Sequence, residues 1–302
     1  MRAVWSFWSK PFFAYKGRIW REPQHHLLAW GLSLRQARKH YPDTQLVTDK
    51  AGKALLVDRL GLHFDEVSTD LEALRDVDPG WWALGKLHAY SLQDRPFIHV
   101  DTDVFLWEPL PAHVASAPVF AQCPEHHPPL DEWCGPQDIE AAFARHELSL
   151  PMEWEWSRSL GNPGFREDNC GIVGGNDVDF LRYYATLGLR LVRDPIYQSA
   201  WSELPDKAGY NMIIEQFLLA ACLDYHRFHP QSPYRGVHIK YLFPTWADTL
   251  DPVKTAQAGY THLLGDAKTN AVVTQRLERR MQREDQDFYR HCLSLSQRAM
   301  SI

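Results

Sequence analysis

The sequence predicts an α/β protein in which a mostly parallel central sheet is flanked by helices. Three observations support this prediction. Short apolar segments alternate with segments of helical periodicity over the first hundred residues, and turn-forming residues separate them. The chain of 302 residues, with 45% hydrophobic content, is also long enough to bury a large core. Such an alternation produces parallel strands joined by right-handed crossovers.

The first hundred residues supply the elements of this sheet in order. The expected strands lie at 3–8, 45–48, 64–67 and 97–100, and the expected helices at 23–40, 52–60 and 82–92. The turn Tyr41-Pro42-Asp43 ends the first of these helices, and Gly61 ends the second. Residues 1–112 therefore have the organisation of a nucleotide-binding half.

Composition and missing motifs exclude several classes of protein. A formal net charge of −6 and a pI near 6.2 argue against a nucleic-acid partner. The sequence contains no G-x-G-x-x-G after the first strand and no P-loop motif, which argues against a dinucleotide oxidoreductase and a P-loop enzyme. The five scattered cysteines favour a reducing cytoplasm over a disulfide framework. We expect neither a signal peptide nor a transmembrane segment.

The second half of the chain is less regular. Periodicity weakens over 113–168, where Pro, acidic residues and Trp accumulate around one expected helix at 137–146, and we interpret this stretch as a functional insertion. A glycine-rich strand at 169–175 follows, then helices at 177–193 and 208–223 and a smaller β-rich part at 225–264. The charged tail, 271–302, is expected to be helical. Such a tail is more often a solvated helix on its own domain than a contact for a membrane surface or a partner.

The stretch PFIHVDTDVFLWEPLP carries the strongest chemical signal. An apolar strand runs directly into Asp101 and Asp103, and residues two apart on a strand point to the same side. In open α/β sheets, ligands bind outside the carboxyl ends of the strands. Two converging carboxylates with no Cys nearby suit Mg²⁺ or Mn²⁺. The alternative is a helix cap or a turn, but no helical pattern follows.

Five segments in chain order resemble the GT-A-fold glycosyltransferases, most closely the glycogenin and bacterial lipopolysaccharide galactosyltransferase type. They are Lys86-Leu87, Asp101-Thr102-Asp103, Asn169-x-Gly171-x-x-Gly174-Gly175, Glu215-Gln216 and His262-x-x-Gly265-x-x-Lys268. The resemblance implies a GT-A domain over 1–270, with an acceptor-binding half at 113–270. It implies sugar transfer from a nucleoside-diphosphate sugar, foremost a UDP-sugar, to an unknown glycan, peptide or small-molecule acceptor in bacterial glycan or glycoconjugate synthesis. Retention of configuration is favoured over inversion.

The resemblance also implies roles for individual residues. The metal ligands would be Asp101, Asp103 and His262, holding Mn²⁺ or Mg²⁺. The donor-binding residues would be Phe7, Lys86, Asp101, Thr102, Asn169, Gly174, Gly175 and Lys268. The reaction-facing pair would be Glu215 and Gln216, where this chain has Glu in place of the family's usual Asp. The insertion has no counterpart in the resemblance; we expect it to shape the acceptor site, with Trp133, Trp154 and Trp156, because binding loops commonly extend from a rigid scaffold.

Several alternatives remain open at the level of the sequence. His238 competes with His262 as the third metal ligand. Gly174 and Gly175 could instead mark a constricted strand end. Glu215 could be an ordinary acidic residue at a helix start.

Two other functions also remain open. A nucleotide-sugar-binding protein could keep the fold without catalysis. An aspartyl-phosphate phosphatase would also place D-x-D after a strand, but it normally has Thr or Val where this chain has Phe105.

Overall fold

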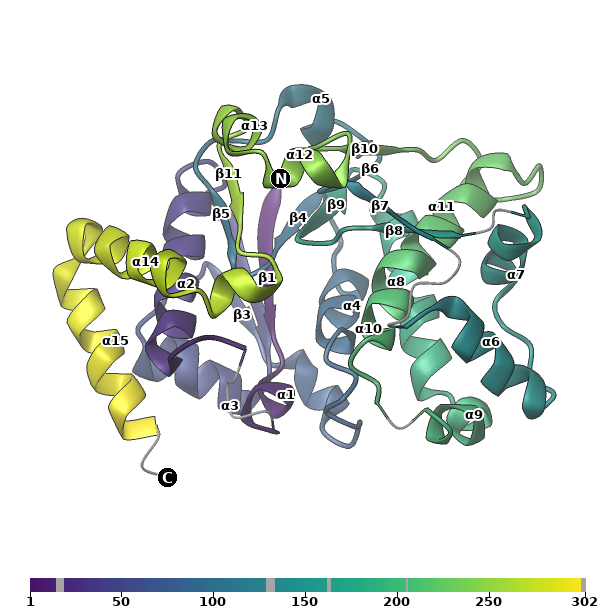
Figure 1. Ribbon diagram of the computed structural model, residues 1–302, viewed down its shortest axis with the longest axis horizontal. Coiled ribbons are helices and arrows are strands. Elements are labelled where there is room, and N and C mark those ends of the chain that lie inside the picture. Colours follow the sequence, from purple (N-terminus) through teal and green to yellow (C-terminus); the bar gives the residue numbers. More distant parts are fainter. Residues whose placement is uncertain (15–18, 129–133, 162–163, 205, 300–302) are drawn as a thin grey trace.

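The computed structural model describes residues 1–14, 19–128, 134–161, 164–204 and 206–299. A seven-stranded sheet lies at its centre, in the order β10-β6-β9-β4-β1-β2-β3 (Figure 1). Its strands are β1 (Arg2–Phe7), β2 (Thr44–Thr48), β3 (Glu66–Ser68), β4 (Phe97–Val100), β6 (Val119–Ala121), β9 (Ile172–Gly175) and β10 (Ile239–Tyr241). Only β9 runs antiparallel to its neighbours in this sheet. The predicted α/β class with a mostly parallel sheet is confirmed.

Two small antiparallel pairs accompany this sheet. The strand β5 (Val104–Leu106) pairs with β11 (Tyr260–His262), and β7 (Pro124–His127) pairs with β8 (Phe165–Asp168). The first pair joins the segment that follows β4 to a segment near the end of the chain. It therefore brings together residues that are far apart in the sequence.

Helices cover both faces of the sheet (Figure 1). In chain order they are α1 (Ser9–Ala14), α2 (Pro23–Arg38), α3 (Lys50–Lys53), η1 (Ala54–Arg59), η2 (Asp70–Leu74), α4 (Leu84–Ser91), α5 (Ala112–Ala115), α6 (Pro136–Arg145), α7 (Met152–Ser159), α8 (Val178–Arg193), η3 (Pro195–Tyr197), α9 (Gln198–Ser202), α10 (Tyr210–Met212), η4 (Ile213–Phe217), α11 (Leu218–Phe228), α12 (Trp246–Leu250), α13 (Pro252–Gln257), η5 (Gly265–Lys268), α14 (Ala271–Glu284) and α15 (Gln286–Ala299). One hydrophobic core includes residues of α4, α8 and α11, and the other includes residues of α2, α14 and α15. None of the helices in the described ranges combines the length and apolar character needed to cross a bilayer.

The helical tail packs against α2. Leu277 and Met281 on α14 and Cys292 and Leu295 on α15 are buried in the same core as that helix. The amphipathic spacing of these residues explains why a strongly charged sequence forms two docked helices. Figure 1 shows both helices along one side of the molecule.

Three local features differ from the sequence expectations. The stretch 113–168, interpreted as an insertion, contains β6, which pairs with β9 and β10 inside the central sheet. Three apolar residues are too few to show a periodicity, and the sequence pattern therefore missed this strand. The stretch 225–264 contains β10 and β11 but also the end of α11 and the short helices α12 and α13. Finally, Asp101 and Asp103 lie in the turn between β4 and β5, not on a strand.

Candidate metal centre

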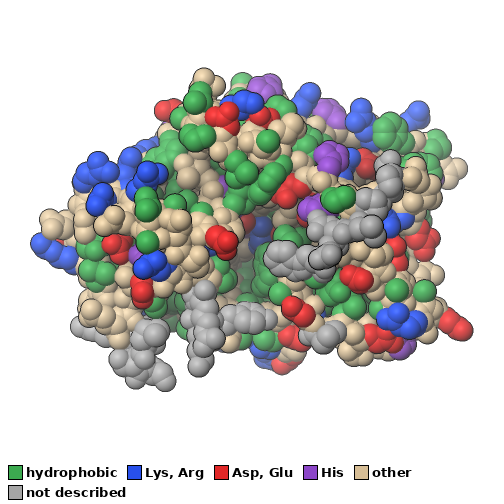
Figure 2. All heavy atoms as spheres, in the orientation of Figure 1, with side chains coloured by type: hydrophobic (Ala, Val, Ile, Leu, Met, Phe, Trp, Pro, Cys, Tyr) green, Lys and Arg blue, Asp and Glu red, His purple; other side chains and the backbone are tan. Residues whose placement is uncertain are grey.

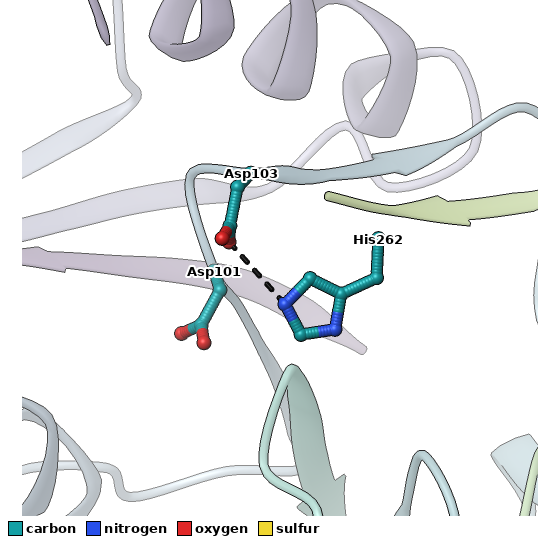
Figure 3. Close-up of side chains that lie close together, drawn as sticks. All are labelled: Asp101, Asp103 and His262. Carbon is teal, nitrogen blue, oxygen red and sulfur yellow. Dashed lines mark ion pairs between the residues drawn. The ribbon is translucent and has the colours of Figure 1, made fainter. Parts of the chain in front are cut away.

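The turn between β4 and β5 is fixed at both ends by backbone hydrogen bonds. The Asp101 amide donates to the Gly171 carbonyl at 3.0 Å, and the Val104 amide donates to the Asp101 carbonyl at 3.0 Å. The Leu263 amide donates to the Asp103 carbonyl at 3.0 Å. This last bond and the β5–β11 pairing place His262 beside the turn (Figure 3).

The ring of His262 is oriented by Gln122. Its Nδ1 lies 2.7 Å from Gln122 Oε1, an oxygen that also accepts the Tyr260 hydroxyl at 2.6 Å. Because this carbonyl oxygen accepts hydrogen bonds, Nδ1 carries a proton and donates to it, and Nε2 is the ring nitrogen left to face a metal ion. Nε2 lies 3.5 Å from Asp103 Oδ1, so this nitrogen is on the side of the carboxylates. Such a hydrogen bond to the other ring nitrogen is typical of metal-binding histidines.

Asp101, Asp103 and His262 fit a divalent cation. One ligand atom from each lies within 4.8 Å of the other two. Figure 3 shows Asp103 and His262 facing one another, with Asp101 next to them. Two carboxylate oxygens and one imidazole nitrogen suit Mn²⁺, and less closely Mg²⁺. His238, the competing ligand, is exposed and does not belong to this group.

Glycine at position 171 leaves the space that His262 occupies. A Cβ there would lie 2.5 Å from His262 Nδ1 and 2.5 Å from Gln122 Oε1. The Asn169 side chain accepts the Gly171 amide at 2.9 Å and so holds this backbone in place. Asn169 thus supports the site through the backbone of Gly171.

Lys268 brings positive charge to Asp103. Its Nζ lies 2.5 Å from Asp103 Oδ2, at the end of η5. Burial alone would raise the pKa of Asp103, but Lys268 and His262 outweigh it and hold this pKa well below its ordinary value. Asp103 is therefore ionised, as a metal ligand must be.

Lys86 connects Asp101 to Glu215. Its Nζ lies 3.0 Å from Asp101 Oδ1 and 2.9 Å from Glu215 Oε1, and it donates to the Cys170 carbonyl at 3.0 Å. Burial lowers the pKa of Lys86, but the two carboxylates outweigh it and raise this pKa overall. Lys86 is therefore charged, and its contacts with Asp101 fix the orientation of that carboxylate.

Glu215 is completely buried in the π-helical turn η4. Its Oε1 accepts the Tyr90 hydroxyl at 2.8 Å in addition to the contact with Lys86. Burial raises the pKa of Glu215, and Lys86 opposes this shift. The carboxylate thus binds Lys86 and Tyr90 instead of facing solvent. Gln216, the next residue, is 9% exposed.

Of the remaining donor-binding candidates, Phe7 and Thr102 lie at the carboxyl edge of the sheet, and the two glycines lie elsewhere. Phe7 ends β1, at the same edge of the parallel sheet as Asp101, and its ring packs on Phe12 and Trp30. Thr102 lies in the turn itself. Gly174 and Gly175 pair instead with Ile98 and Phe97, toward the start of β4.

The two glycines are required by the sheet. A Cβ at Gly174 would lie 2.0 Å from the Phe97 carbonyl oxygen, and one at Gly175 would lie 2.0 Å from that of Pro118. These close approaches leave no room for a side chain, as the alternative of a constricted strand end requires. The structure does not bring these glycines to the carboxylates.

Of the tryptophans expected at the acceptor site, Trp154 is buried in the core and Trp156 contacts aromatic rings of the segment around α11. Trp154 is 1% exposed, and its ring packs on Phe217. Trp156 contacts the rings of Tyr225 and His229. Trp133 lies outside the described residues.

Sequence reasoning missed Gln122, Tyr90 and His26. Gln122 directly follows the unrecognised strand β6, so no pattern marked it.

His26 lies on α2, where its Nε2 accepts the Trp30 indole N–H at 3.0 Å. Burial lowers the pKa of His26 to about 4; Asp103 opposes this shift and Lys268 adds to it. His26 therefore stands within electrostatic reach of the metal centre as a neutral side chain.

Acidification is expected to destabilise the protein through His26. Between pH 6.5 and 4 the unfolded chain binds a proton at this residue that the folded chain does not. Folding stability therefore falls as the pH is lowered, by about 3 kcal/mol in total from this residue. Urea unfolding of the wild type and of His26→Gln at pH 7 and pH 4.5 measures this contribution. An equally steep pH dependence in both proteins would contradict it.

Fold and site together define an α/β protein with a candidate divalent-metal centre at the carboxyl edge of its sheet. The model of a family of unknown function, DUF6734, matches residues 1–295, and the chain belongs to this family. No curated protein sequence matches the chain significantly.

Two solved structures show a distant likeness. One is the galactosyltransferase LgtC in complex with donor and acceptor sugar analogues, at 12% identity and a TM-score of 0.38, covering 92% of this chain and 94% of that one. The other is an active-site mutant of LgtC, at 12% identity and a TM-score of 0.36, with the same coverage. A likeness at this level does not transfer an activity.

Proposed function

We propose that this protein is a metal-dependent glycosyltransferase that moves a sugar from a nucleoside-diphosphate sugar, foremost a UDP-sugar, to an acceptor. The observation that carries the proposal is the group Asp101, Asp103 and His262, flanked by Lys86 and Lys268. The motif resemblance supports it, because the same residues are those that the glycosyltransferase pattern picks out. A divalent cation held there would supply Lewis-acid stabilisation to the diphosphate leaving group.

Lys268 is the residue proposed to bind the diphosphate. Without a ligand its ammonium group pairs with Asp103, at the end of a short helical turn. Its side chain is 21% exposed, whereas that of Asp103 is 8% exposed. Lys268 can therefore turn toward a phosphate group more easily than Asp103 can leave its position. A cation next to the leaving group stabilises the negative charge that develops there.

Glu215 and Gln216 are proposed to have different roles. Glu215 is a positioning residue, because it acts on Asp101 through Lys86. Gln216 is the member of the pair proposed to face the transferred sugar, from a π-helical turn of the kind often found at functional sites. A neutral amide in that place is compatible with retention of configuration, which the motif resemblance favours.

The two halves of the chain are proposed to divide the substrates. Residues 1–112 provide the turn with Asp101 and Asp103, and 113–270 provide Gln122, His262 and the acceptor side. We assign 271–302 to a helical tail outside this division.

Donor turnover tests the proposal directly. The full-length protein is incubated with a panel of UDP- and GDP-sugars with Mn²⁺ or with EDTA, and release of the nucleoside diphosphate is measured. We expect Mn²⁺-dependent release from at least one UDP-sugar. Cleavage of p-nitrophenyl phosphate without cleavage of any sugar nucleotide would indicate a phosphatase instead. Donor binding by calorimetry without any turnover would indicate a binding protein.

A further inference from the structure

A second group of metal-ligating side chains lies on the ribbon formed by β7 and β8. Glu125 and Glu167 are direct partners in the antiparallel register. His127 is two residues after Glu125 and therefore points to the same face of the ribbon. One ligand atom from each of the three residues lies within 4.8 Å of the other two. We propose that Glu125, His127 and Glu167 form a second site for a divalent transition-metal ion such as Zn²⁺ or Mn²⁺.

The charge balance of this ribbon favours a cation. Like charges placed directly opposite one another on adjacent strands are destabilising, and Glu167 is only 2% exposed. In the part of the chain that the structure describes, no Lys or Arg forms an ion pair with either glutamate. The neighbouring Arg166 points to the other face, where it binds Asp168 and Asp224 at 3.1 Å each.

Among the described residues, the polar contacts of the two glutamates with His127 and Asn169 supply at most one positive charge. His127 Nε2 lies 3.0 Å from Glu167 Oε2, and a protonated imidazole would offset only one negative charge. The Asn169 amide donates to Glu125 Oε1 at 2.5 Å and adds no charge. A divalent ion would neutralise both carboxylates at once.

The donor set and its surroundings indicate the kind of ion. Two carboxylate oxygens and one imidazole nitrogen are a common ligand set for Zn²⁺ and Mn²⁺ sites that keep an open position. His127 stacks on Phe165, with ring centroids 4.7 Å apart, and this contact fixes the plane of the imidazole. His127 and Phe165 are also among the residues that line a pocket of about 340 Å³. The group shares no ligand with the one around Asp103.

Counting bound ions tests this proposal independently of any activity. The full-length protein is dialysed against Mn²⁺ or Zn²⁺, and the bound metal is measured by elemental analysis or, for Mn²⁺, by electron paramagnetic resonance. We expect two ions per chain in the wild type. Glu167→Gln and Glu125→Gln should each lower the count to one, as should Asp103→Asn through the other site.

Glu203→Gln removes a carboxylate that binds Arg145 and His146 at the surface, and it should leave both ions bound. One ion in the wild type, lost in Asp103→Asn and kept in both glutamate variants, would remove the second site while leaving the proposed transferase centre intact. Glu125→Gln keeps the test valid if the more buried Glu167→Gln does not fold, as circular dichroism would show.

Discussion

Asp103→Asn is expected to lower turnover of a nucleotide-sugar donor by on the order of 10³-fold while the protein stays folded. Asp103 is the ligand that both His262 and Lys268 approach, and its depressed pKa keeps it ionised. Asn keeps the shape and can still accept a hydrogen bond from Lys268, but it removes the negative charge that a cation needs. A metal's Lewis-acid contribution of several kcal/mol corresponds to about this loss in rate.

The measurement is steady-state release of nucleoside diphosphate with saturating Mn²⁺, together with the Mn²⁺ affinity of the variant. Asp78→Asn is a matched control, because Asp78 also pairs with a lysine, Lys207, at 2.7 Å but lies at the surface. It should keep full activity. Unchanged turnover in Asp103→Asn, or unchanged turnover of the wild type in EDTA, would remove the metal from the mechanism.

Lys86→Met is expected to cost about 3–5 kcal/mol of folding stability, the usual cost of removing one partner from a buried ion pair. The substitution keeps an unbranched side chain of similar length but leaves Asp101 and Glu215 without their shared cation. Glu215 is completely buried, so water cannot replace the lost partner. The free energy of unfolding, measured with urea at pH 7, gives the effect.

Two further variants separate charge from packing. Lys207→Met removes a lysine from the Asp78 pair at the surface and should cost less than about 1 kcal/mol. Adding Glu215→Gln to Lys86→Met should restore part of the stability, because it removes one of the two uncompensated charges. If Lys86→Met is no more destabilising than Lys207→Met, the buried network does not contribute as we infer. If Glu215→Gln restores nothing, the coupling runs through Asp101 alone.

The sequence by itself determined the fold class, most strands of the parallel part of the sheet and the acidic residues at its carboxyl edge. The strands at 97–100 and 45–48 lie within a residue of where the structure has them, because buried parallel strands are short apolar runs bounded by turn residues. Asp101 and Asp103 were visible because polar residues directly after such a run stand out. Lys86 and His262 were found only through the motif resemblance, since neither has a local pattern of its own.

Tertiary structure alone decided which of these side chains meet and how they are held. His262 reaches Asp103 through the β5–β11 pairing, a contact between segments that no local periodicity encodes. Gln122 orients His262 from the position directly after β6, a strand of three residues that is too short to be recognised in the sequence. The sequence does not show whether Glu215 is exposed or buried. Only the packing of η4 against Lys86 and Tyr90 makes it part of a buried ion network. Sequence patterns report which side of an element is apolar, whereas charge pairing depends on distances that only the complete fold sets.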